Sequence, residues 1–137
     1  MSLVIDSSIT LAWFFEDERS AGADAVLRQV ADSGAVAPAL WKLEVANGLQ
    51  MAVRRKRIDE AFRDASIADL RALGVVIDAQ TDQQAWSTTL QLADRWRLTL
   101  YDAAYLELAQ RLGLPVATLD KELRAAGTAL GLSVLGD

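Results

Sequence analysis

Four acidic residues of this sequence are spaced so that folding could bring them together. They are Asp6, Glu44, Asp102 and Asp120. Four converging carboxylates repel one another and raise their pKa values, but a divalent cation makes the same cluster favourable, because carboxylate, water and phosphate oxygens can share its coordination shell. An ion held in this way activates water and stabilises charge on a phosphate. The four acids therefore predict hydrolysis of a phosphodiester bond with Mg²⁺ or Mn²⁺.

Composition restricts this chemistry further. The chain contains neither histidine nor cysteine. This excludes thiolate nucleophiles, disulfides and iron–sulfur clusters, and it removes the commonest general base and the commonest zinc ligand. Any bound metal must take oxygen ligands, which favours Mg²⁺, Mn²⁺ or Ca²⁺. The net charge of −5 does not indicate a protein that coats nucleic acid, but it allows a local acidic site that acts through bound cations.

Short apolar runs alternate with longer helical patterns along the chain, which is typical of βαβ units and a parallel sheet. Strands are expected over residues 3–5, 35–37, 75–77, 115–119 and 133–135. Helices are expected over 7–15, 20–30, 38–55, 59–73, 82–95, 102–113 and from 121 to about 127–131. Ser7 and Ser8 are expected to cap the first helix and Thr81 the fifth. We predict one domain over residues 1–137, an α/β doubly wound sheet of about five parallel strands with helices on both faces.

Such a sheet would position the acids. Ligands bind beyond the carboxyl ends of the strands, at the point where the strand order reverses. Asp6 ends the first expected strand and Asp120 follows the fourth. The small side chains of Ala103 and Ala104 would let their helix approach the sheet closely and bring Asp102 near the strand ends.

Each acid also has a structural interpretation. The three aspartates lie just before or at expected helix starts, where Asp is a preferred N-cap. Glu44 lies inside a helix but outside its polar strip, so its charge should be paired, either with a cation or with a neighbouring Arg or Lys. Asn47, one turn along, could orient Glu44 or be a solvated helix residue.

Four motifs resemble a known family. They are Ile5-Asp6-Ser7-Ser8, Trp41-x-x-Glu44-Val45-Ala46-Asn47, Tyr101-Asp102-Ala103-x-Tyr105 and Thr118-Leu119-Asp120. In this order they resemble the PIN domain and, more narrowly, the VapC toxins of bacterial toxin–antitoxin pairs. The resemblance runs over nearly the whole chain.

The resemblance implies an endoribonuclease that uses Mg²⁺ or Mn²⁺ and cuts structured RNA such as transfer RNA. Its acidic positions match Asp6, Glu44, Asp102 and Asp120, and Ser8 and Thr118 match polar positions beside them. It also implies a homodimer and inhibition by a cognate VapB-type antitoxin.

Two further features complete the expectations. The basic run Arg54-Arg55-Lys56-Arg57 could contact RNA phosphates or form a solvated helix end. No stretch is long and apolar enough to span a membrane, and the first residues lack a positively charged leader, so we expect a cytoplasmic protein.

Other functions fit the sequence less well. A receiver domain would need adjacent acids after the first strand, and a haloacid-dehalogenase-type phosphatase would need a second Asp at the position of Ser8. The sequence has neither GxxxxGK[ST] nor GxGxxG. A non-enzymatic α/β interaction module and a PIN nuclease outside toxin systems remain as alternatives.

Overall fold

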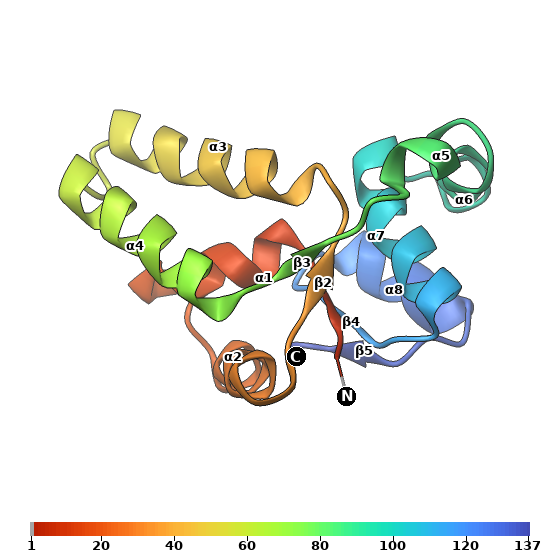
Figure 1. Ribbon diagram of the computed structural model, residues 1–137, viewed down its shortest axis with the longest axis horizontal. Coiled ribbons are helices and arrows are strands. Elements are labelled where there is room, and N and C mark those ends of the chain that lie inside the picture. Colours follow the sequence, from red (N-terminus) through yellow and green to blue (C-terminus); the bar gives the residue numbers. More distant parts are fainter. Residues whose placement is uncertain (1) are drawn as a thin grey trace.

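The computed structural model describes residues 2–137 as a parallel sheet between two helical layers (Figure 1). Within these residues the sheet has five parallel strands of two residues each, in the spatial order β3-β2-β1-β4-β5. The strands are β1 (Val4–Ile5), β2 (Val36–Ala37), β3 (Val76–Ile77), β4 (Val116–Ala117) and β5 (Val134–Leu135). Because β1 pairs with both β2 and β4, the strand order reverses beside β1. The predicted doubly wound fold is confirmed.

The helices divide between the two faces of the sheet. They are α1 (Ser7–Ala12), α2 (Ala21–Ser33), α3 (Trp41–Arg54), α4 (Glu60–Leu73), α5 (Thr81–Ala85), α6 (Thr88–Trp96), α7 (Leu100–Leu112) and α8 (Lys121–Ala129), with a short 3₁₀ helix at Glu16–Glu18. Figure 1 shows α1 to α4 on one side of the strands and α5 to α8 on the other. None of the helices described within residues 2–137 is long and apolar enough to cross a membrane.

Helix α7 lies at the centre of its layer and packs against β1 and β4. All residues from Ala103 to Ala109 are buried. Small side chains make this close approach possible, since Ala103 and Ala109 are fully buried without filling much volume. The expected close approach of this helix to the sheet is therefore confirmed, and it places the first turn of α7 at the carboxyl ends of the strands.

The prediction of a single helix over 82–95 is wrong, because the chain forms two helices there. Trp86 ends α5, and Ser87 has φ −124° and ψ −100°, outside the helical region. Figure 1 shows α5 and α6 running in different directions, and both pack against α7. Thr81 is also not a cap, since it is the first residue of α5 and its hydroxyl accepts a hydrogen bond from the backbone N–H of Ala39.

Candidate active site

Asp6 lies directly after β1, at the carboxyl edge of the sheet, and only 4% of it is exposed. It caps α1, because its Oδ1 accepts a hydrogen bond from the backbone N–H of Ile9 at 2.9 Å. The Ser8 hydroxyl donates to both carboxylate oxygens, and the Thr118 hydroxyl donates to Oδ2. The expectation that Ser7 and Ser8 cap this helix is wrong, since the cap is Asp6 and Ser8 instead fixes the orientation of its carboxylate.

Burial raises the pKa of Asp6 to about 6, because removal from water disfavours the charged carboxylate. Hydrogen bonds from Ile9, Thr118 and Ser8 oppose this increase, and the charge of Asp102 adds to it. The cost of ionising Asp6 in the folded protein is therefore only partly offset by its three donors.

This raised pKa predicts how the stability of the metal-free protein depends on pH. A carboxyl whose pKa is about 6 in the folded state and 3.8 when freely solvated stabilises the fold below the lower value, and loses that contribution as pH rises through the higher one. In EDTA we expect the melting temperature of wild type, relative to Asp6→Asn, to fall between about pH 4 and about pH 7. Thermal unfolding followed by circular dichroism measures this difference. Parallel curves for the two proteins would contradict the prediction.

Thr118 follows β4 and connects two of the acids. It donates to Asp6, and its Oγ1 accepts a hydrogen bond from the backbone N–H of Asp120 at 3.0 Å. The end of β5 lies directly behind it: Gly136 has φ +109°, and a Cβ added there would lie 2.9 Å from Ile9 Cδ1 and 3.1 Å from the Thr118 carbonyl oxygen. Glycine is therefore required at this position both by its backbone conformation and by the lack of space.

Glu44 lies in the first turn of α3, half-buried, and contacts the opposite helical layer. The Tyr105 hydroxyl of α7 donates to Glu44 Oε1 at 2.5 Å. Burial, together with this bond, raises the pKa of Tyr105 well above its usual range, so the hydroxyl stays protonated as a donor. Asn47 is exposed, and it is Tyr105 that orients Glu44.

The role of Tyr105 is not evident from the sequence. A signal was available, because Tyr105 follows Asp102 by three residues and so lies on the same side of α7. Its partner Glu44, however, is 61 residues away in the chain, and local spacing does not indicate such a pairing.

Asp102 is the third residue of α7 and is half-buried. The expectation that it opens the helix is wrong: α7 begins at Leu100, and Thr99 is the cap that accepts from the Asp102 backbone N–H at 3.1 Å. Burial raises the pKa of the Asp102 carboxyl, and the charges of Asp120 and Glu44 raise it further. Asp120 and Glu44 must therefore lie near Asp102 for their charges to affect its pKa.

Asp120 caps α8, with Oδ1 accepting a hydrogen bond from the Leu123 backbone N–H at 2.9 Å. Capping and clustering therefore coexist at Asp120 and at Asp6. The charges of Asp120 and Glu44 raise the pKa of Asp102, and the charge of Asp102 raises the pKa of Asp6, so the members of each of these pairs lie close enough to interact.

The oxygen donors fit a hard divalent cation, although the side chains do not form a complete cage. In the part of the chain described here, no three His, Cys, Asp or Glu side chains are arranged so that they could hold a metal ion by themselves. Mg²⁺ usually keeps several waters and binds through one or two carboxylates together with substrate phosphates. One or two of the four acids, with water and a phosphate, would satisfy such an ion.

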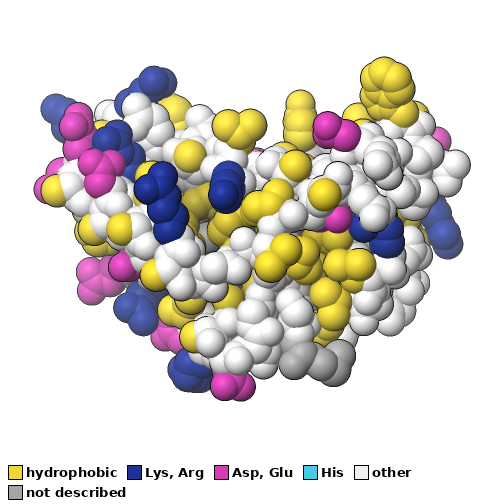
Figure 2. Space-filling view, in the orientation of Figure 1, with side chains coloured by type: hydrophobic (Ala, Val, Ile, Leu, Met, Phe, Trp, Pro, Cys, Tyr) yellow, Lys and Arg dark blue, Asp and Glu magenta, His cyan; other side chains and the backbone are white. Residues whose placement is uncertain are grey.

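A hollow in the molecular surface lies between the two helical layers. Figure 2 shows the molecule notched between the start of α3 and the start of α7, with hydrophobic side chains on both sides. Glu44 and Asp102 lie in the first turns of these two helices. Both acids are half-buried, as is Asp120, whereas Asp6 is buried.

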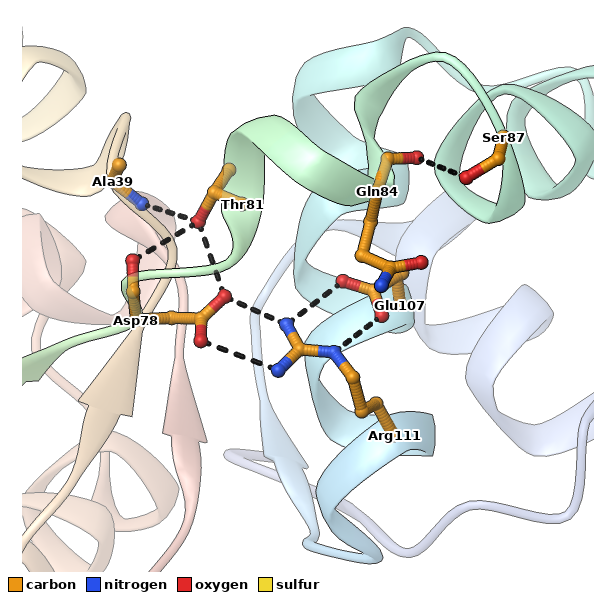
Figure 3. A network of polar contacts seen from close by, with 7 residues as sticks. All are labelled: Ala39, Asp78, Thr81, Gln84, Ser87, Glu107 and Arg111. Atoms are coloured by element: carbon orange, nitrogen blue, oxygen red, sulfur yellow. Dashed lines mark hydrogen bonds and ion pairs between the residues drawn. The ribbon is translucent and has the colours of Figure 1, made fainter.

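A second polar cluster connects α7 to the edge of the sheet (Figure 3). The Arg111 guanidinium donates to both carboxylate oxygens of Asp78, at 3.2 and 2.6 Å, and to both oxygens of Glu107, at 2.8 and 3.1 Å. The Thr81 hydroxyl donates to Asp78 and accepts from the backbone N–H of Ala39. The cluster thus joins α7 to the segment that leads into α3, the two helices that contain Asp102 and Glu44.

The basic run after α3 is only partly free to meet RNA. Arg57 pairs with Asp17 at 2.9 Å and Glu18 at 3.3 Å, and its guanidinium lies 4.4 Å from the centre of the Phe15 ring. Residues 54–56 are exposed. A contact between these residues and RNA remains a prediction.

A parallel α/β domain with acidic side chains at its switch point defines the class of fold, and comparison with known proteins identifies the family. The PIN domain family matches residues 3–128. The chain therefore belongs to the PIN domain family, and the resemblance found in the sequence is confirmed.

Three relatives describe this similarity. Ribonuclease VapC3 of Pyrobaculum aerophilum is 29% identical over 123 residues, which cover 90% of this chain and 92% of the relative. The structure of PAE2754, also from Pyrobaculum aerophilum, matches with a TM-score of 0.68 and 22% identity over 92% of this chain and 84% of that one. VapC20 of Mycobacterium tuberculosis, a Sarcin-Ricin loop cleaving toxin, matches with a TM-score of 0.60 and 19% identity over 91% and 95%. The two structures show a shared fold.

Proposed function

We propose that this protein is a metal-dependent endoribonuclease and the toxin of a VapBC-type pair. The observation that supports the proposal is that burial and nearby acids raise the pKa values of Asp6 and Asp102, with Asp102 acting on Asp6 and with Asp120 and Glu44 acting on Asp102. Membership of the PIN family and the similarity to Ribonuclease VapC3 support the same activity.

The chain's own residues prepare the site for a charged substrate. Ile9, Ser8 and Thr118 fix the carboxylate of Asp6. Tyr105 fixes that of Glu44. Side chains that are oriented before the substrate arrives need no reorganisation during the reaction, which is the main source of electrostatic catalysis. Mg²⁺ or Mn²⁺, when bound, would lower the pKa of a water molecule and offset charge on the scissile phosphate.

Assembly and substrate also belong to the proposal. Similarity to proteins named VapC supports a cognate VapB-type antitoxin as a partner and RNA as the substrate. A homodimer and structured RNA such as transfer RNA are proposed on the family resemblance alone.

The experiment compares RNA 5′ ends in bacterial cells after induction of wild type, Glu44→Gln or the matched control Glu60→Gln. Gln keeps an oxygen that can accept from Tyr105 but removes the charge at position 44. Glu60 is exposed in the first turn of α4, a helix that contains none of the four acids of the site. We expect new ends at a few sites with wild type and Glu60→Gln and none with Glu44→Gln.

Purified protein completes the test on the RNAs so identified. Cleavage should occur with Mg²⁺ or Mn²⁺ and stop in EDTA, because without a cation nothing at the site lowers the pKa of the attacking water. Cleavage that persists in EDTA, or equal cleavage by wild type and Glu44→Gln, would contradict a metal-dependent carboxylate site. The absence of new ends with every protein would favour the interaction module.

A further inference from the structure

Exposed hydrophobic and basic residues lie next to three of the acids in the sequence. We call these three the rim residues: Leu43, Tyr101 and Lys121. Leu43 precedes Glu44 and is 76% exposed, and Tyr101 precedes Asp102 and is 64% exposed. Lys121 follows Asp120 directly. Each of the three half-buried acids therefore has a neighbour that projects into solvent beside it.

Helix geometry places Tyr101 at the mouth of the site. Tyr101 lies four residues before Tyr105 on α7, so the two rings share one face of the helix, one turn apart. Tyr105 donates to Glu44 and is 1% exposed. Tyr101 is one turn nearer the start of the helix and is 64% exposed, so its ring lies on the solvent side of the contact between Tyr105 and Glu44.

The charge of the rim favours a polyanion over a neutral partner. Lys121, the first residue of α8, is exposed and directly follows Asp120. Among the ion pairs formed within residues 2–137, none involves Lys121. A strand of phosphates that enters the hollow would meet this cation beside the acids.

We propose that Tyr101 stacks on an unpaired RNA base next to the scissile phosphate, while Lys121 contacts a flanking phosphate. This inference rests on the proposed ribonuclease function and assigns residues of this chain that would hold the nucleotides beside the cut. A base within a duplex is covered on both faces by its neighbours, so it presents no face to an aromatic ring. Stacking on an aromatic side chain is the common way in which proteins bind unpaired bases.

The test measures binding and cleavage separately. Binding of a fluorescent single-stranded oligoadenylate, and of a blunt RNA duplex of equal length, is followed by anisotropy in EDTA at low salt, where no cleavage occurs under the proposed function. The proteins are wild type, Tyr101→Ala, Tyr101→Phe and the control Phe62→Ala. Phe62 is an exposed aromatic residue on α4, 43% accessible, and lies outside the rim.

For single-stranded RNA, we expect Tyr101→Ala to weaken binding about tenfold and Tyr101→Phe to stay within about twofold, because Phe keeps the ring that stacks. Phe62→Ala should bind as wild type does, and duplex binding should not respond to Tyr101→Ala. With Mg²⁺ and an RNA that wild type cleaves, Tyr101→Ala should raise KM about tenfold while kcat changes little.

The outcomes separate the two proposals. If wild type cleaves no RNA, the ribonuclease function fails, whereas the anisotropy arm still decides whether Tyr101 stacks on bases. If wild type cleaves and Tyr101→Ala binds single strands as well as wild type does, the stacking role is wrong. If Tyr101→Ala instead changes the molar mass measured by light scattering and leaves RNA binding intact, the residue belongs to a protein interface and the inference is overturned.

Discussion

Replacement of Asp102 by Asn should abolish RNA cleavage without lowering the stability of the metal-free protein. Removal of one preorganised charge from such a site costs at least about 100-fold in kcat. The carboxylate of Asp102 lies under the influence of Asp120 and Glu44, which raise its pKa. The neutral amide of Asn relieves this repulsion. In EDTA near neutral pH the melting temperature of Asp102→Asn should therefore equal or exceed that of wild type.

The matched control is Asp94→Asn, which removes an exposed charge from α6. We expect this variant to cleave RNA and to melt as wild type does, because exposed charges contribute little to stability. Cleavage rates and thermal unfolding are measured on the same preparations. An Asp102→Asn protein that loses both activity and metal-free stability would indicate a structural role for this carboxylate and would contradict the cluster.

The second large effect is expected at Arg111. Arg111→Met should lower the free energy of unfolding by about 3 kcal/mol, because it leaves the buried carboxylate of Glu107 and the half-buried carboxylate of Asp78 without their cation. The side chains of Glu107 and Asp78 are 4% and 10% exposed, so water cannot replace the guanidinium fully. Urea unfolding measures the loss.

A second substitution distinguishes an unpaired charge from lost packing. Glu107→Gln combined with Arg111→Met removes both charges of the pair within α7, and should recover part of the stability lost in Arg111→Met alone. The control is Arg28→Met, an exposed residue of α2, which should change the free energy of unfolding by less than about 0.5 kcal/mol. A loss of similar size for Arg111→Met with and without Glu107→Gln would mean that packing, not charge, holds this part of α7.

The elements around the acids could be predicted because their signals are local. Asp6 and Asp120 each follow a short apolar run, and Gly74 and Gly113 end α4 and α7 in the left-handed conformation. The alternation of strands and helices then fixes the parallel sheet, and a parallel sheet brings its strand ends to one edge.

The start of α7 shows where local signals are insufficient. Thr99 and Asp102 are both good capping residues and lie three positions apart, so either could begin the helix. The backbone conformation decides for Thr99, with φ −65° and ψ 158°. Likewise, the helix patterns of α5 and α6 are continuous in sequence, and their separation at Ser87 depends on how both meet α7.

Contacts between residues that are distant in the chain could not be predicted either, because no local pattern in the sequence indicates them. Glu107 and Arg111 are one turn apart, a spacing that indicates an ion pair. Nothing local points to Asp78, which is 33 residues from Arg111, or to the contact between Thr81 and Ala39 over 42 residues. These contacts depend on the order of strands in the sheet, which the pattern of apolar runs alone does not define.

The close packing of Gly136 behind Thr118 has a consequence for genetics. Any side chain at position 136 would push against the Thr118 carbonyl and Ile9, and would displace the hydroxyl that donates to Asp6. A genetic selection for inactive variants of the protein should therefore recover substitutions at Gly136 as well as at the four acids. Inactivating mutations are thus not confined to the residues that take part in the chemistry, and they include changes at a glycine, which has no side chain.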